Sequence, residues 1–343
     1  EFLLNAPELA NETKKIRGLQ KRPAAVTALV LQERPAENPR PTFVHHRGEY
    51  LSPTDEVGVG TPEALHPFPD DLPQNRLGFA KWLVSRDNPL TARVVVNRHW
   101  AAFFGTGLVA TLEDFGMQGE SPSHPELLDW LAVNFMDSGW SLKQLHRLIV
   151  TSATYRQTAT RTKDDTTSNL PSDRLLSRFP RSRLEAEIIR DATLMAAGVL
   201  SLKPGGPPVR PVQPDGVTES AFGRPKWHAN SGEDRFRRSL YTYQKRTAPF
   251  AMYGTFDAPS GESCVARRDV SNTALQALTL LNDPMFLEAA QALGRLTAQQ
   301  KGDDAKRVRF AFRRVVTRPP GDHELARLTE FLAKQRDRAA RQE

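Results

Sequence analysis

The sequence predicts a mainly α-helical protein with two lobes and a minor β element near the N-terminus. Apolar residues recur at helical spacing along most of the chain beyond residue 75. Several of these segments open with a residue that caps helices, as at Ser141 and Thr273. A polar stretch with almost no apolar residue, 158–173, separates two groups of such segments. We therefore expect about eight to ten helices in two lobes, because the chain is longer than one typical core requires.

Residues 1–40 are expected to be the tail of an upstream region, so that the chain is the C-terminal part of a longer product. Residues 5–17 carry Asn and Glu early and Lys and Arg late, the order that a helix dipole favours. Residues 23–50 hold two β-branched runs separated by a loop of Pro, Asn and Glu, which predicts a small strand pair. Five prolines between residues 51 and 73 predict an ordered surface strap without regular structure.

The first lobe, residues 41–157, is expected to contain the strand pair, the strap and four helices. Pro125 stands at a favourable first position of a helix, and Gly139 at a favourable stop. Ser141 and Gln144 have the spacing of a capping box, which predicts that another helix opens there. The expected helices cover 76–85, 90–104, 125–139 and 141–155, the first two being separated by Asn88-Pro89.

A polar linker is expected at 158–180 and a second helical lobe at 181–343. Capping signals indicate where its helices start, and Ser182 with Glu185 has the spacing of a capping box. The helices are expected to begin near Ser182, Thr273 and Asp283 and to cover 303–316 and 322–339.

Two segments of the second lobe do not follow a helical pattern. Residues 203–234 form a loop that is long enough to suggest a function. Residues 237–246 alternate in polarity, which fits either a strand or a short helix.

The composition describes a folded chain and excludes several classes of protein. Hydrophobic residues make up 39% and charged residues 25%. The formal charge of +7 arises from 35 Arg and 12 Lys without a basic run, so we expect no nucleic-acid partner. No segment reaches the roughly 18 apolar residues of a membrane span. The single Cys264 excludes an internal disulfide, a haem c attachment motif and a multi-cysteine zinc site within this chain.

Three long segments together resemble one known family. They cover residues 75–135, 141–157 and 267–286, and the shorter pieces 40–50 and 237–259 are also similar. The chain resembles the planctomycete-specific domain of unknown function that follows planctomycete cytochrome c-like domains in large exported proteins. The resemblance extends over roughly residues 40–320.

The resemblance implies a role beside other domains. It implies an extracytoplasmic location, at the periplasm or cell surface, and cytochrome c-like and companion domains of the same polypeptide as partners. Haem c is then expected on an upstream domain and no cofactor in this chain. The first functional hypothesis is accordingly an accessory domain with a binding or redox-accessory role. The alternative is a polysaccharide-binding or polysaccharide-degrading domain with a pocket lined by Arg and Asp.

The densest polar cluster lies in the first lobe. Arg93 and Asn97 are four residues apart and share a helix face, while His99 points elsewhere. An Arg–Asp pair that only stabilises the fold is one interpretation. The other is a pocket in which Arg holds an anionic group and a carboxylate moves protons. The candidate pocket, drawn from both lobes, consists of Arg93, Asn97, Arg98, Asp114, His124, Glu126, Arg246, Asp257 and Arg267.

A second cluster lies on the helix after the linker. Glu187 is four residues from both Arg183 and Asp191, which fits ordinary surface pairs along a helix. Aromatic residues among the charged ones suit a sugar or another polyhydroxylated ligand. These aromatic residues are Trp227, Tyr241, Tyr243, Tyr253 and Phe256.

The sequence contains no complete match to a standard catalytic or metal-binding motif. His124-x-Glu126 lacks the Pro-Cys-x-x-Cys of the zinc deaminases. His45 and His46 are adjacent, and neighbouring side chains of a strand point to opposite faces, so no metal site is expected. No serine stands in a nucleophile elbow. Catalytic residues therefore stay unassigned, and the sequence leaves open whether the chain is an enzyme.

Overall fold

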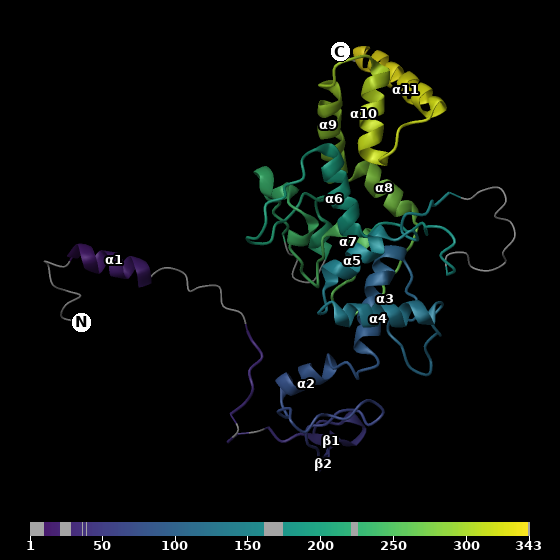
Figure 1. Ribbon diagram of the computed structural model, residues 1–343. Helices are drawn as coiled ribbons and strands as arrows, with labels where there is room; N and C mark the ends of the chain where they lie inside the picture. Colours follow the sequence, from purple (N-terminus) through teal and green to yellow (C-terminus); the bar gives the residue numbers. More distant parts are fainter. Residues whose placement is uncertain are drawn as a thin grey trace. The chain divides into compact units, whose positions relative to one another are not determined.

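The computed structural model describes residues 10–20, 29–35, 37–38, 40–160, 174–220 and 226–341. Within these ranges it contains eleven α-helices and one two-stranded sheet (Figure 1). The predicted mainly α fold with a minor N-terminal β element is confirmed. Contacts along the chain define two compact units, residues 1–92 and 93–343. The predicted linker at 158–180 lies mostly outside the described residues, and the two-lobe division stays a prediction.

The first unit holds a helix, α1 (Ala10–Gln20), and a small antiparallel sheet. Strand β1 (Phe43–His45) pairs with β2 (Pro53–Glu56), with Phe43 opposite Glu56. The partner strand thus comes from the segment assigned to the proline strap, and residues 29–35 have no regular structure. Pro53 begins a strand, where its missing N–H is tolerated. A tight turn between the strands reverses the chain, with positive φ at Arg47 and Gly48.

The rest of the strap packs on α2 (Arg76–Leu83). Asn75 caps this helix by accepting hydrogen bonds from the backbone of Leu77 and Gly78. The buried Trp82 stacks on His66 and donates its indole N–H to the carbonyl oxygen of His66 at 3.0 Å. A Cβ at Gly78 would collide with the carbonyl oxygen of Pro73, so glycine is needed there.

Three helices of the predicted first lobe surround one hydrophobic core. They are α3 (Thr91–Phe104), α4 (Pro125–Asp137) and α5 (Leu142–Thr151). Pro125 opens α4 as predicted, and Ser141 caps α5 by accepting from the backbone N–H of Gln144. The helix α5 ends at Thr151, one turn earlier than expected. The core side chains include Val96, Trp100, Phe104, Leu108, Leu128, Leu131, Phe135, Leu145 and Ile149.

Six further helices follow. They are α6 (Ala186–Ala197), α7 (Ala251–Thr255), α8 (Ala274–Asn282), α9 (Pro284–Ala298), α10 (Asp304–Val316) and α11 (Asp322–Ala340). Three of them, α6, α7 and α9, contribute to a second core. This core includes Leu194, Phe250, Met252, Tyr253, Phe256, Met285, Phe286 and Ala289. Figure 1 shows α9, α10 and α11 grouped at the C-terminal end of this unit.

Helix starts in this part follow the capping residues with one exception. Thr273 forms the predicted capping box with Gln276, and Asp283 accepts a hydrogen bond from the backbone of Met285. The capping box at Ser182 is wrong, because α6 begins at Ala186. Arg183 lies outside the helix, where its guanidinium binds Asp257 and two carbonyl oxygens.

The loops between α6 and α7 are organised by a buried arginine. Arg190 of α6 has no exposed surface, and its guanidinium donates to the carbonyl oxygens of Arg235 and Arg237, both at 2.8 Å. Its neighbour Asp191 accepts the backbone N–H of Ser239 at 2.7 Å. Burial lowers the pKa of Arg190, with Tyr253 and Asp191 acting in the opposite direction. Arg190 and Asp191, on one turn of α6, therefore fix the backbone path of residues 235–239.

A second buried arginine continues this network. The guanidinium of Arg237 donates to the carbonyl oxygens of Lys203, Gly205 and Pro207 and stacks on Tyr241. The start of the expected loop, residues 203–207, is thus held to the core through its backbone. Residues 237–246 form a 3₁₀ turn at Ser239–Tyr241 followed by a single bridge to Val209. In the described chain this segment is neither a full strand nor an α-helix.

We expect Arg190→Lys to destabilise the protein by about 2–4 kcal/mol. A lysine ammonium cannot serve two separated carbonyl oxygens as the guanidinium fork does, so buried acceptors lose their partner. Urea denaturation of purified protein measures the loss. Arg238→Lys is the matched control, since its side chain is half exposed and a surface change of this kind stays within about 0.5 kcal/mol. Equal stability of the two variants would contradict the anchoring role of Arg190.

Candidate functional site

The predicted polar cluster of the first lobe is built around Asn97. This side chain is fully buried on α3; its amide donates to the carbonyl oxygen of Val109 and accepts from the N–H of Val109, both at 2.9 Å. A Cβ at Gly107 would lie 2.7 Å from the same amide. Both hydrogen-bonding groups of Asn97 are therefore used to fix the loop after α3.

The other members of this cluster contact nearby residues. Arg93 binds Asp129 of α4 at 2.7 Å. Asp114 accepts the backbone N–H of Gly116 at 2.7 Å and so closes its own loop. His124 contacts Ser123 at 3.0 Å. Arg98 and Glu126 are exposed. The link from α3 to this loop thus runs through Asn97, and Arg93 joins α3 to α4.

In the predicted second lobe, Asp257 is the centre of a polar network. Its carboxylate accepts from Arg183 at 2.6 Å and from both the backbone N–H and the hydroxyl of Ser271 at 2.8 Å. The amide of Gln276 lies 3.5 Å away. The hydrogen bonds from Ser271, and then the contact with Arg183, lower the pKa of Asp257. This carboxylate is held ionised by neighbours from two segments, at Arg183 and at Ser271.

The nine candidate residues fall into separate local arrangements. Arg246 and Arg267 are exposed, on the loops before and after α7. No candidate residue lines the cavities that the described residues form beside the β1–β2 sheet, around Trp227 or among α9, α10 and α11. The convergence of both sets on one pocket stays a prediction.

Charged residues of α6 and of the segment before it form long-range pairs. Glu187 of α6 binds Arg268 at 2.6 Å, and Arg183, which precedes the helix, binds Asp257. The predicted pairs at four-residue spacing are thus replaced by contacts between the helix and distant loops. The aromatic residues of this region are packed: Trp227 stacks on Phe250, and Tyr253 is buried.

Helix α8 has its apolar side outward. Gln276 is 4% exposed, and its amide donates to the carbonyl oxygen of Thr255 at 3.0 Å. Leu275, Leu278 and Leu281, spaced by three residues, are 59%, 59% and 69% exposed. Most apolar helix faces pack against a core, so these leucines form an apolar surface without an intramolecular partner in the described chain. We call Leu275, Leu278 and Leu281 the α8 leucine face.

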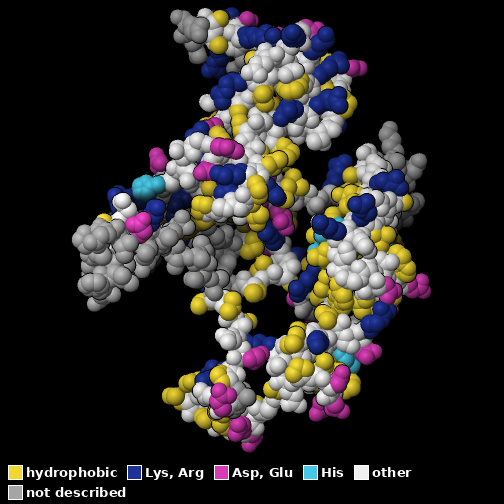
Figure 2. Space-filling model, turned by 60° about the vertical axis from the view of Figure 1, so that its left-hand side comes forward, with side chains coloured by type: hydrophobic (Ala, Val, Ile, Leu, Met, Phe, Trp, Pro, Cys, Tyr) yellow, Lys and Arg dark blue, Asp and Glu magenta, His cyan; other side chains and the backbone are white. Residues whose placement is uncertain are grey.

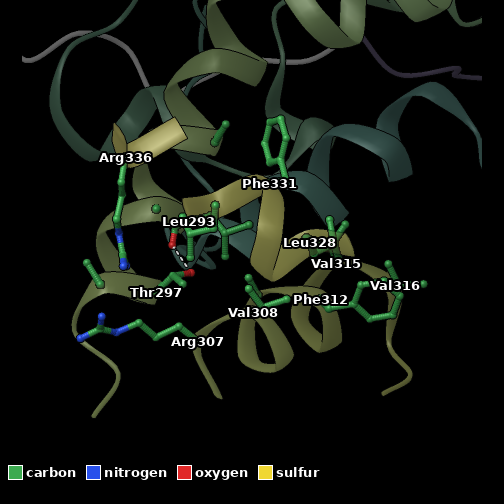
Figure 3. A pocket seen from close by; sticks show the side chains of 15 residues that line it. Leu293, Thr297, Arg307, Val308, Phe312, Val315, Val316, Leu328, Phe331 and Arg336 are labelled. Carbon is green, nitrogen blue, oxygen red and sulfur yellow. Dashed lines mark hydrogen bonds between the residues drawn. The ribbon is translucent and has the colours of Figure 1, made fainter. Parts of the chain in front are cut away.

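A second apolar feature is a groove between α9, α10 and α11, with a volume of about 750 Å³. Lys and Arg side chains gather with hydrophobic ones around these helices (Figure 2). Arg307 and Arg336 lie at one end of the groove, and Phe312 and Val316 at the other (Figure 3). We call it the C-terminal groove. Its lining consists of Ala290, Leu293, Gly294, Thr297, Ala298, Arg307, Val308, Ala311, Phe312, Val315, Val316, Leu328, Phe331, Leu332 and Arg336.

Two histidines meet between α3 and α5. The Nε2 atom of His146 lies 3.0 Å from Nδ1 of His99, and Phe103 packs edge-on against His146. Burial, and then the neighbouring His146, lowers the pKa of His99. The neutral form of His99 is therefore favoured in the folded chain.

The described residues include neither a metal-binding cluster nor a membrane-spanning helix. No group of three or more His, Cys, Asp or Glu side chains in the described ranges is arranged to hold a metal ion. In the same ranges, no helix combines the length and apolarity needed to cross a bilayer. Cys264 is exposed and free.

A family comparison identifies the chain. The model of the PSD1 family, described as a protein of unknown function (DUF1553), matches residues 75–332. The chain belongs to this family. The resemblance to a domain of unknown function seen in the sequence is confirmed. Searches among curated proteins and among solved structures found no match.

Sequence reasoning about this PSD1 chain missed both apolar surfaces. The α8 pattern shows leucines on one side and Gln276 with Thr279 on the other. Such a pattern normally predicts that the leucines are buried and the polar side is exposed. The hydrogen bonds of the buried Gln276 show that in α8 the leucines are exposed instead. The groove had a clearer signal, since Val308, Phe312 and Val315 follow helical spacing on a short, very basic helix.

We expect Asp257→Asn to lower the thermal midpoint at neutral pH, because the amide cannot accept all the hydrogen bonds that the carboxylate accepts. The folded pKa of Asp257 is below its ordinary value, so its stabilising effect is present above about pH 4 and is lost as the pH falls further. Thermal unfolding at pH 7 and at pH 3 measures this difference. The exposed Glu262→Gln in the following loop is the control. A constant gap between wild type and Asp257→Asn at both pH values would contradict the interpretation.

We expect His99 to make the chain less stable in mild acid. The unfolded chain takes up a proton on this residue near pH 6.5, whereas the folded chain does so at lower pH. Stability therefore falls as the pH drops from about 7 through 6.5. In His99→Asn this loss should be smaller, as measured by urea denaturation at several pH values. His323→Asn, an exposed histidine on α11, should keep the wild-type pH profile.

Proposed function

We propose that this PSD1 domain is an accessory domain that binds a c-type cytochrome-like domain of the same longer polypeptide through the α8 leucine face. The single observation that carries the proposal is the reversed orientation of α8, with Gln276 inside and three leucines outside. Full burial of a leucine side chain is worth about 1.5–3 kcal/mol, so covering this face favours association. The partner domain then supplies the core that α8 lacks.

The helix cannot hide its leucines by rotation. The amide of Gln276 donates to the carbonyl oxygen of Thr255 and to the hydroxyl of Ser271, and its oxygen accepts the N–H of Thr273. Turning the helix would leave buried polar groups without partners, at a cost of about 1–3 kcal/mol each. The exposed leucines are thus a fixed property of the fold, as a permanent docking surface requires.

The sequence resemblance supports the choice of the partner and of the location. It supports a place outside the cytoplasm, at the periplasm or cell surface, with haem c on the upstream domain and a binding or redox-accessory role for this one. Trp227 and Tyr253 pack against protein neighbours, which disfavours the polysaccharide alternative.

We expect Leu278→Glu combined with Leu281→Glu to abolish binding to the upstream cytochrome-like domain. Two carboxylates in an apolar interface would lose their hydration without gaining partners. Isothermal titration of the separately produced upstream domain into this chain measures the affinity. Leu202→Glu is the control, because Leu202 is 67% exposed and lies outside α8. Unchanged binding of the double variant, or no binding by the wild type, would refute the proposal.

A further inference from the structure

The C-terminal groove is an open trough between three helices. Helix α10 packs against both α9 and α11, and each helix lines the groove with residues at helical spacing. Phe331 and Val315 are each 59% exposed, and Val316 is 41% exposed. Sites for small molecules enclose most of their ligand, typically about 70–90% of its surface. The C-terminal groove is too open to enclose a small molecule in this way. It suits an elongated ligand that lies along the groove.

The length of the groove fits a short helix. On α9 the lining runs from Ala290 to Ala298, and on α10 from Arg307 to Val316. At a rise of about 1.5 Å per residue these stripes are about 12–14 Å long, which is between two and three helical turns. Helices that bind in apolar grooves use anchors at positions i, i+3, i+4 and i+7, which span about 10.5 Å and so fit within this length.

Gly294 provides an independent sign that another backbone approaches. It lies in the middle of α9, where glycine costs about 1 kcal/mol relative to alanine. A Cβ at this position would meet no atom within 4 Å, so packing inside the described chain does not require glycine. Together with Ala290 and Ala298 it leaves a flat strip on the wall of the groove. A flat strip of this kind lets a second helix come close.

The charge of this region favours an acidic ligand. Residues 303–341 contain eleven Lys and Arg against six Asp and Glu, a formal charge of +5 out of +7 for the whole chain. At the polar end of the groove, Arg307 and Arg336 share the single carboxylate of Asp304, at 3.5 Å and 2.6 Å. One positive charge is therefore left over at the end of an apolar trough.

We propose that the C-terminal groove binds an acidic amphipathic helix of a partner protein. Its apolar side chains fill the trough, its backbone lies against Gly294, and its carboxylates face Arg307 and Arg336. An anionic membrane would share the charge preference, but membranes are entered by protruding apolar side chains, whereas these line a hollow. The proposal goes beyond the docking role of α8, because it uses different residues and a different ligand.

The test uses a fluorescein-labelled synthetic peptide of about 15 residues, long enough to form a helix. Leucines occupy positions i, i+3, i+4 and i+7 of its pattern, and glutamates most of the others. We expect fluorescence anisotropy to show saturable binding to the full chain. Gly294→Leu should raise the Kd about tenfold or more, because the new side chain fills the trough. The thermal midpoint of this variant should stay the same or rise, since leucine is a better helix former than glycine.

Matched controls distinguish peptide binding in the C-terminal groove from nonspecific binding. Gln291→Leu adds a leucine to α9 outside the groove and should leave the Kd unchanged. Arg307→Gln with Arg336→Gln should weaken binding and reduce its salt dependence, whereas Arg338→Gln should not. A peptide with lysine in place of glutamate should bind about tenfold more weakly or worse.

Three results would overturn the proposal. They are no saturable binding of the acidic peptide, equal binding to wild type and Gly294→Leu, or equal binding of the acidic and basic peptides. Binding of the chain to vesicles that contain phosphatidylserine is measured as well. Vesicle binding that persists in Gly294→Leu, without peptide binding by the wild type, would assign the groove region to a membrane surface. Leu278→Glu with Leu281→Glu should leave peptide binding intact, so failure of the α8 proposal is distinguishable from failure of this one.

Discussion

The fold of the larger unit depends on the buried guanidinium of Arg190. It stands on α6 and holds two backbone carbonyl oxygens of the segment that leads to α7. Arg237, whose own carbonyl oxygen is one of them, then holds three more carbonyl oxygens between Lys203 and Pro207. Two arginines thus hold these irregular backbone segments together, as the hydrogen bonds between strands hold a sheet together. A cationic donor is suited to this task, because hydrogen bonds from charged groups are stronger than those between neutral groups.

Local chemistry made the helices predictable. Ser141, Thr273 and Asp283 mark helix starts by accepting backbone N–H groups that lie within a few residues. Pro125 marks the start of α4 through its fixed φ at the first helical position. These signals are local, so the sequence alone specifies them. The failures involve distant partners. Ser182 has the right spacing for a cap, but Arg183 is drawn to Asp257 and the helix starts later. The strand partner of Phe43–His45 likewise depends on a turn at Arg47 and Gly48, which no periodicity predicts.

The candidate site shows the same limit. The polar residues around Asn97 and Asp257 were recognisable as clusters, but their partners lie far along the chain: Val109 for Asn97, and Arg183 and Ser271 for Asp257. The α8 leucine face could not be identified from its pattern, since an amphipathic sequence does not say which face is inside. The hydrogen bonds of one glutamine decide it.

The anchors of the long loop are made to main-chain oxygen atoms, which every amino acid possesses. Lys203 and Pro207 can therefore be exchanged for other residues without loss of an acceptor, provided that the backbone keeps its path. Gly205 is the exception, because its positive φ favours glycine. Natural variation in this segment is then free to change the outer side chains while the scaffold beneath stays constant. Members of the family can in this way acquire different surface specificities on one unaltered frame, much as variable loops do on a conserved framework.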